Sequence, residues 1–240
     1  MDIPWLYDEQ RETGTGFADE ATAREWDTRA QQQRAFGHEA ETIAEELSLT
    51  PDSLVWEIGT GGGELALNLA RRCKQVYASD TSPTMLDIAR KKARERSIGN
   101  VMFEQGGFLS GFTPPWPVDG IIIQLTLHHL PDFWKLAALK RIGGFLKRNG
   151  MLYLRDIFFP SKIPDYNAYI AGMLAAIQAT SGPELADQTA AHIKDEYSTF
   201  AWIIEEMLAQ AGFEVLRSRQ HRFTTAYTCV SNRSTGPTGR

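Results

Sequence analysis

The chain has 240 residues, of which 42% are hydrophobic and 23% are charged. This length and composition are typical of one soluble globular domain, and they argue against long disorder and against collagen-like or coiled-coil architecture. The formal net charge of -5 makes a long nucleic-acid duplex a poor candidate partner, because duplex binding requires positive charge. The negative charge is concentrated at the front, where residues 1–50 hold 12 acidic and 4 basic side chains.

Cysteine content and hydropathy limit the other classes of partner. Cys73 and Cys229 are the two cysteines, which are too few and too far apart for a disulfide framework or a cysteine-based zinc site. No metal site is therefore predicted. The sequence has no apolar run of about 18 residues and no signal-peptide pattern at its start. We expect a cytoplasmic protein without a membrane span, and we leave open whether it is a monomer or a homodimer.

In chain order, the first predicted element is a helix over residues 20–48, and we interpret residues 1–48 as a helical N-terminal cap. Strands and helices then alternate. The predicted strands are 54–58, 76–79, 101–104, 120–125 and 151–157, and the predicted helices are 64–72, 83–96 and 133–147. Such alternation predicts an α/β fold with a parallel sheet and helices on both of its faces.

The pattern changes after Phe159. Residues 160–198 carry no strand pattern and predict a helical insertion within a domain that spans residues 49–230. Thr199 is expected to cap a last helix that ends at Gly212. Two strands over 213–219 and 223–230 are expected to form a closing hairpin, and residues 231–240 are expected to form a flexible tail.

A strand followed by a glycine-rich turn carries the strongest chemical signal. Gly59, Gly61 and Gly63 let the backbone take positive φ and let a ligand approach closely. The spacing departs from the dinucleotide fingerprint G-x-G-x-x-G, because Glu64 stands where the third glycine is needed. Glu57 adds a carboxylate that suits a cationic amine better than a pyrophosphate. Asp80 ends the second strand, where it could accept hydrogen bonds from ribose hydroxyls or simply cap the next helix.

Several segments resemble the class I methyltransferases that use S-adenosylmethionine. They are the motif Glu57-x-Gly59-x-Gly61-x-Gly63 and the segments Ser79–Leu86, Leu127–Asp132, Asn149-Gly150 and Ala211–Phe213. The resemblance covers roughly residues 40–230 and is closest to the small-molecule branch that includes ubiquinone and menaquinone methylases. It implies a Rossmann-like, seven-stranded, mostly parallel sheet with an antiparallel last strand. It also implies helices on both faces and a helical cap built from the N-terminus and the 160–200 insertion.

The resemblance further implies S-adenosylmethionine as cofactor, S-adenosylhomocysteine as product, and a set of cofactor-binding residues. The methionyl end would lie on Glu57, Gly59, Thr60, Gly61 and Gly63, the ribose on Asp80, the adenine near Thr81, Met85, Gly107 and Phe108, and the sulfonium near Gln124 and Leu125. Many relatives have an aspartate after the third strand to receive the adenine amino group, whereas this chain has Gln105-Gly106-Gly107-Phe108. Gln105, a backbone carbonyl or packing against Phe108 would replace it.

Methyl transfer from a sulfonium is an in-line displacement, so the protein must align the reactants and exclude water. A base matters only if the acceptor has to lose a proton. The expected partner is a small-molecule acceptor, which an aromatic-lined site would suit if it is apolar, planar or cationic. The candidate substrate-binding residues are Tyr7, Trp26, His129, Tyr166, Tyr169 and Trp202, and the candidate catalytic residues are His129 and Tyr166.

Other interpretations remain open for these residues and for the chain. His128 and His129 could form a packing loop, and the tyrosines could be core residues. A last group could lie over the pocket or on a solvated helix face, and its members are His192, Asp195, Glu196 and Tyr197. Two alternative functions share the cofactor motif. One is an NAD-dependent oxidoreductase, and the other is a non-catalytic S-adenosylmethionine-binding protein.

Overall fold

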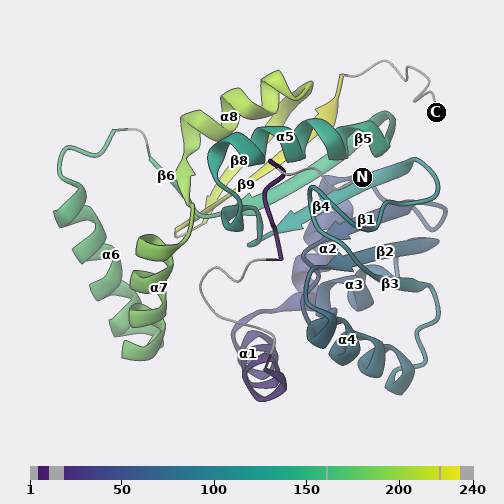
Figure 1. The fold of residues 1–240 in the computed structure, drawn as a ribbon, viewed down its shortest axis with the longest axis horizontal. Helices are drawn as coiled ribbons and strands as arrows, with labels where there is room; N and C mark the ends of the chain where they lie inside the picture. The colour runs from purple at the N-terminus through teal and green to yellow at the C-terminus, as the bar shows by residue number, and fades with distance from the viewer. Residues whose placement is uncertain (1–4, 11–18, 161, 222, 233–240) are drawn as a thin grey trace.

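A computed structural model describes residues 5–10, 19–160, 162–221 and 223–232 (Figure 1). The helices are α1 (Glu20–Gln33), α2 (Phe36–Glu46), α3 (Glu64–Leu69), α4 (Pro83–Glu95), α5 (Asp132–Ile142), α6 (Tyr166–Ser181), α7 (Pro183–Asp195) and α8 (Ala201–Gln210), with 3-10 turns η1 (Leu127–His129) and η2 (Gly143–Phe145). The strands are β1 (Leu54–Ile58), β2 (Gln75–Asp80), β3 (Val101–Gln105), β4 (Val118–Gln124), β5 (Leu146–Asp156), β6 (Phe158–Phe159), β7 (Thr199–Phe200), β8 (Phe213–His221) and β9 (Thr224–Ser231).

Seven strands form one sheet in the order β3-β2-β1-β4-β5-β9-β8. Strands β1 to β5 are parallel to one another, whereas β9 is antiparallel to both β5 and β8. The prediction of a mostly parallel, seven-stranded sheet that ends in an antiparallel strand is confirmed. From β1 the chain builds the sheet outward through β2 and β3, and then returns to β4 on the other side of β1. Ligands of open α/β sheets bind outside the carboxyl ends of the strands at such a switch point.

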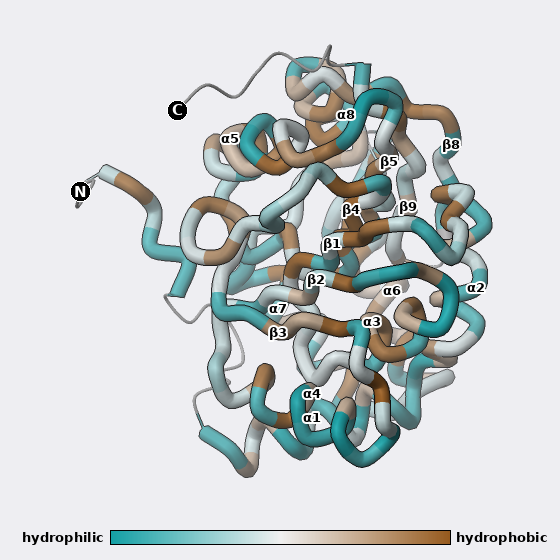
Figure 2. The backbone as a smooth tube through the Cα atoms, turned by 90° about the vertical axis from the view of Figure 1, so that its right-hand side faces the viewer, coloured by the Kyte–Doolittle hydropathy of each residue, from teal (hydrophilic) through white to brown (hydrophobic). Residues whose placement is uncertain are grey.

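The centre of the sheet is buried on both faces, as expected for parallel strands that carry nearly continuous apolar runs. In β4, Ile121 and Ile123 join the core cluster formed with α5 and α8, whereas Ile122 joins the cluster formed with α2, α3 and α4. This alternation follows from the two-residue period of a strand. Figure 2 shows the resulting hydrophobic backbone segments in the middle of the sheet, between the two helical layers.

The predicted helix over residues 20–48 is two helices. α1 ends at Gln33, and Arg34 leaves the helical conformation, with φ -119° and ψ 136°. Its guanidinium donates to Glu39 and lies 4.3 Å from the centre of the Phe36 ring. Because of this break, the two helices pack against different parts of the fold. α2 packs in the core against the sheet, whereas α1 lies against α4.

Two further predicted boundaries were wrong. The helix expected over 133–147 ends at Ile142, because Gly143 and Gly144 begin a 3-10 turn and β5 already starts at Leu146. Thr199 does not cap α8. It pairs with Phe158 in the short β6–β7 ladder, and its hydroxyl donates to Asp132 instead.

The helical insertion consists of α6 and α7, which stand to one side of the sheet in Figure 1. The β6–β7 ladder joins the two ends of this insertion, so its base is held beside the sheet. Among the described residues, no helix is both long enough and apolar enough to cross a membrane. The predicted tail after residue 232 lies outside the described residues.

Candidate active site

A cavity of about 910 Å³ opens at the carboxyl ends of the parallel strands. Residues that follow β1, β2, β3 and β4 form one side of it, and residues of α1 and α7 form the other. Its volume falls in the range of small-molecule and cofactor sites. The N-terminal and inserted helices therefore meet the sheet at the place where a ligand of this fold class binds.

The glycine turn forms its wall with backbone rather than side chains. Gly59, Gly61 and Gly63 have φ of 77°, 54° and 78°, which other residues rarely adopt. A Cβ at Gly59 would overlap Thr126, whereas a Cβ at Gly61 would find its nearest atoms, in Met85 and Trp26, at 3.5 Å. Gly61 therefore keeps the cavity open for a ligand that approaches the main chain.

Two carboxyl groups, the buried Glu57 and the partly exposed Asp80, flank this turn. Glu57 accepts a hydrogen bond from the Thr60 hydroxyl at 2.9 Å, and burial raises the pKa of Glu57 to about 8. Asp80 accepts from the amides of Gly61 and Ser82 at 2.8 and 2.9 Å, and burial raises its pKa above the ordinary value. Both groups lack a cationic partner at contact distance among the described residues, so a cationic or hydroxyl-bearing ligand would find acceptors there.

Gln124 offers a third acceptor in the cavity wall. Its Nε2 donates to Glu39 at 2.8 Å, which fixes the orientation of the amide. Its Oε1 is buried and has no hydrogen-bond partner within the described residues. A buried acceptor without a partner costs roughly 1–3 kcal/mol, and a bound ligand with an N–H group would recover that cost. The arrangement fits the charged amino-acid end of S-adenosylmethionine.

The loop after β3 is held by a residue from the distant N-terminal segment. The Glu9 carboxylate accepts from the amides of Phe108 and Ser110 at 2.7 and 2.6 Å. A Cβ at Gly107 would overlap this carboxylate. Glu9 thus brings an acid to the point where many methyltransferases carry an aspartate in the loop itself. Gln105, one of the replacements considered above, donates its amide to the carbonyl of Thr81.

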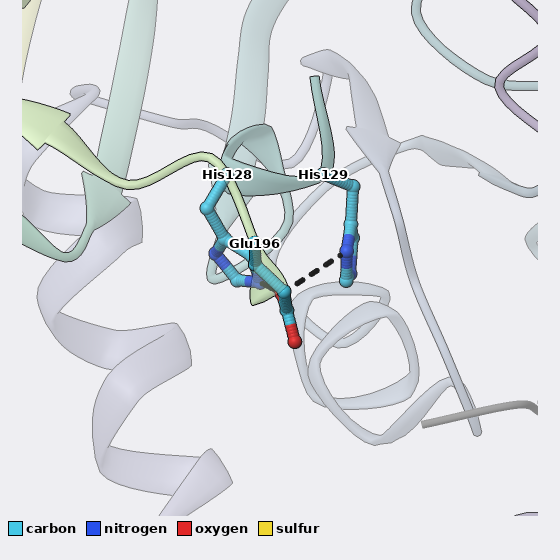
Figure 3. Close-up of side chains that lie close together, drawn as sticks. All are labelled: His128, His129 and Glu196. Carbon is cyan, nitrogen blue, oxygen red and sulfur yellow. Dashed lines mark ion pairs between the residues drawn. The ribbon is translucent and has the colours of Figure 1, made fainter. Parts of the chain in front are cut away.

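A cluster of histidines lies at the opposite wall. His128 is buried between Asp156 and Glu196, with 2.6 Å from Nδ1 to Asp156 and 3.0 Å from Nε2 to Glu196. Burial alone would lower the pKa of His128, but the two carboxylates raise it to about 9. Glu196 is also within 3.3 Å of His129, and the surrounding imidazoles hold its pKa well below the usual range despite burial. Figure 3 shows the two imidazoles and the Glu196 carboxylate between them.

The structure brings most of the candidate residues to this cavity. Those that line it are Glu57, Gly59, Thr60, Gly61, Asp80, Thr81, Met85, Gly107, Phe108, Gln124, Leu125, Trp26 and His129. Gly63 lies beneath it, packed against Ala89.

Besides Gly63, four candidate residues do not line the cavity. Tyr7 packs against Trp134, and its hydroxyl donates to the carbonyl of His129 at 3.5 Å. Tyr166 and Tyr169 are on the first turns of α6, where the Tyr166 ring meets Phe200. Trp202 is on α8 and 57% exposed. The aromatic residue type alone could not show which of these side chains face the cavity, because this depends on how the helices pack in the fold.

Other lining residues were not selected from the sequence. Glu9, Asp27 and Glu184 belong to the N-terminal segment, α1 and α7, and they carry no motif. For His192 and Glu196 the sequence left open a position over the pocket or on a solvated helix face, and in the structure both line the cavity.

Comparisons with known proteins indicate the family of this chain. A family model described as a methyltransferase domain matches residues 55–150. An uncharacterized methyltransferase of Geobacillus kaustophilus is 31% identical over 177 residues, which cover 74% of this chain and 76% of the relative. This chain belongs to the class I S-adenosylmethionine-dependent methyltransferases. A methyltransferase of Bacillus velezensis is 27% identical over 183 residues, covering 76% of this chain and 80% of that one.

The methyltransferase fold extends over nearly the whole chain. Magnesium protoporphyrin IX methyltransferase of Synechocystis, solved with bound S-adenosylhomocysteine, superposes with a TM-score of 0.61 and 21% identity. The match covers 91% of this chain and 90% of that one. Family membership supports an enzyme rather than a binding module, and it gives no support to an NAD-dependent oxidoreductase. The ubiquinone-type branch is not confirmed.

Proposed function

We propose that this methyltransferase transfers the methyl group of S-adenosylmethionine to a small-molecule acceptor held beneath α1 and α7. The observation that supports this most directly is the extent of the cavity. It runs from the glycine turn to residues of both helices, among them Trp26 and His192. The cavity is partly open to solvent, and its volume of about 910 Å³ suits a small molecule.

The donor would lie along the glycine turn. In this arrangement Glu57 and Gln124 receive the charged amino-acid end, Asp80 receives the ribose hydroxyls, and Met85 flanks the adenine. Thr60, Gly61, Thr81, Gly107, Phe108 and Leu125 complete the donor contacts, with Gly63 supporting the turn from below. Two details support the assignment. Gln124 Oε1 has no partner among the described residues, and the cavity side of Gly61 is open.

The acceptor would lie on the far side of the donor. We assign Trp26 and His129 to it, because both line the cavity. Tyr7 would act indirectly, since its hydroxyl contacts the backbone of His129. Residues 1–48 and the 160–198 insertion would then serve as the cover of this acceptor site.

The reaction requires little acid–base catalysis from the protein. The donor is already activated and its leaving thioether is neutral, so the protein's task is to align the acceptor with the methyl carbon and to keep water out. A base at His129 matters only if the acceptor atom carries a proton. We also propose a cytoplasmic location, where the two buried free cysteines would stay reduced.

A transfer assay tests the proposal. The protein is incubated with S-adenosylmethionine labelled in its methyl group and with a panel of thiols, quinols, phenols, amines and carboxylates. We expect labelled product and stoichiometric S-adenosylhomocysteine with at least one small-molecule class. Labelling of added RNA or protein, with none of the small molecules modified, would overturn the small-molecule acceptor.

A further inference from the structure

Three potential metal ligands converge beside the proposed acceptor site. His128 Nε2 and His129 Nδ1 lie 3.0 and 3.3 Å from Glu196 Oε2. One ligand atom from each of the three residues lies within 4.8 Å of those of the other two. Figure 3 shows both rings directed at the carboxylate from opposite sides. The ligands come from η1 and from the residue after α7, so they are brought together only by the fold.

The surroundings fix these ligands in place. Asp156 binds Nδ1 of His128 at 2.6 Å, which leaves Nε2 to face Glu196. Carboxylate contacts of this kind orient most metal-binding histidines. The segment after Glu196 is also fastened, because the Tyr197 amide donates to the His128 carbonyl at 2.9 Å and Lys135 donates to the Tyr197 carbonyl.

Three imidazole nitrogens gather around a single oxygen of the Glu196 carboxylate. His192 Nδ1 also approaches Oε2, at 3.1 Å, and the Ser198 hydroxyl lies 2.8 Å from the other nitrogen of that ring. Yet Oε2 is buried and has no hydrogen bond of normal geometry with the described residues. Three ring nitrogens within 3.3 Å of one carboxylate oxygen, none of them in a hydrogen bond of normal geometry with it, match a site in which a cation joins the nitrogens and the oxygen.

We propose that His128, His129 and Glu196 bind a divalent transition metal ion of the Zn²⁺ class. Two imidazoles and one carboxylate, with further positions open, are a ligand set of catalytic zinc sites and also suit other imidazole-binding divalent metals. His192 is a positioning residue that supports Glu196. The composition of the sequence predicted no metal, because cysteine spacing was the signal considered.

The location of the ion gives it a role that rests on the proposed function. All three ligands line the cavity, so an ion there faces the acceptor. A bound metal ion lowers the pKa of a coordinated O–H or S–H group. The acceptor would release this proton to water on binding, its anion would form the new bond to the methyl carbon, and the methyl–sulfur bond of the donor would break. The preferred acceptors are therefore hydroxyl- or thiol-bearing small molecules.

Metal analysis of the purified, untagged protein tests the site. After chelator treatment the full chain is titrated with Zn²⁺, and with Co²⁺ as a spectroscopic probe. We expect about one high-affinity ion per chain, with Co²⁺ absorption typical of nitrogen and oxygen ligands. His129→Ala and Glu196→Gln should each weaken binding by more than about 100-fold, and His192→Ala by roughly 10- to 100-fold, as for outer-shell partners.

His38→Ala is the matched control, because His38 is exposed on α2 and should leave the affinity unchanged. The inference is overturned if no stoichiometric Zn²⁺ or Co²⁺ binding is seen, or if binding survives both His129→Ala and Glu196→Gln. S-adenosylmethionine binding is measured on the same samples. If the wild-type chain binds S-adenosylmethionine but no metal ion, only the metal site is refuted. If the wild-type chain does not bind S-adenosylmethionine, the proposed function is refuted.

Discussion

At the scale of single residues, Glu57 is a buried carboxyl group with no cationic partner at contact distance among the described residues. It is 3% exposed, and its nearest polar partner is the neutral Thr60 hydroxyl. Burial without a cation favours the protonated form, so the folded chain holds a proton that an unfolded chain releases at neutral pH. The same carboxyl group becomes useful as an anion once a cationic ligand reaches it.

This environment predicts a pH dependence of stability. Glu57 has a pKa near 4.5 when unfolded and about 8 when folded. Its protonated form favours the folded state fully below pH 4.5, and the benefit is lost as the pH rises toward 8. Glu57→Gln should remove this slope, which is at most about 1.4 kcal/mol per pH unit. Urea unfolding of both proteins between pH 5 and 8, without ligand, measures it. Parallel stability curves would show that Glu57 titrates normally.

Local spacing in the sequence was enough to predict which residues of the glycine turn and of the strand ends lie together. Glu57, Gly61 and Asp80 lie at or near the carboxyl ends of the adjacent strands β1 and β2, and all three line one cavity, while their roles toward the cofactor stay predictions. Glu9 could not be found in this way. Its partners are backbone amides about a hundred positions away. Because every residue except proline has a backbone amide, the sequence does not show which amides a side chain will bind. Glu196 was visible only as a polar residue of a helical region.

At the scale of elements, a buried ion pair joins α1 to α4, and the lysine of this pair also contacts the glycine turn. Asp27 contacts Lys92 of α4 at 2.7 Å, and the same ammonium donates to the carbonyl of Gly62 at 3.0 Å. Lys92 also contacts Glu64 at 3.0 Å. The position of α1 over the cavity therefore depends on ion pairs, to Lys92 of α4 and from Arg29 to Glu184 of α7, more than on a large apolar face, since Ala23 is the α1 residue in its buried contact with α4.

We predict that Asp27→Ala loosens α1. Lys92 keeps its contact with Glu64, so the loss should be about 1–3 kcal/mol rather than the larger cost of a fully stranded charge. The matched control is Glu25→Ala, which removes an exposed pair with Arg29 on the same helix and should cost less than about 0.5 kcal/mol. Urea unfolding gives both values. Equal effects of the two substitutions would refute the special role of Asp27.

Elements with a strong periodic pattern were predicted within a few residues, as β1 and α4 show. Boundaries failed where tertiary contacts decide them. Arg34 interrupts a helical pattern because Glu39 and Phe36 bind its guanidinium. Thr199 is of a residue type that often caps helices, but its backbone pairs with Phe158 in the β6–β7 ladder and its hydroxyl donates to Asp132.

At the scale of the whole molecule, residues from several distant parts of the chain line the ligand site. The cavity is lined from the sheet edge, the N-terminal segment, α1 and α7. A ligand that binds there should stabilise all of these parts together, because it binds the folded chain and not the unfolded one. At 100 times its dissociation constant, a ligand adds about 2.7 kcal/mol to the free energy of unfolding.

We therefore predict that S-adenosylhomocysteine at that concentration raises Tm by roughly 5–10 °C, given about 2–4 °C per kcal/mol for chains of this size. Differential scanning calorimetry measures the shift, and adenosine alone should give a smaller one. A Tm that does not respond to the product would contradict a site built from the whole fold.

The central claim is that Asp80 and the glycine turn bind S-adenosylmethionine. Isothermal titration of the wild-type chain, Asp80→Asn and the exposed control Asp87→Ala with S-adenosylmethionine and with NAD tests it most directly. We predict binding of S-adenosylmethionine but not NAD, a loss of about 1–3 kcal/mol, or roughly 5- to 150-fold, for Asp80→Asn, and wild-type affinity for Asp87→Ala. Binding of NAD in place of S-adenosylmethionine, or an unchanged affinity of Asp80→Asn, would contradict it.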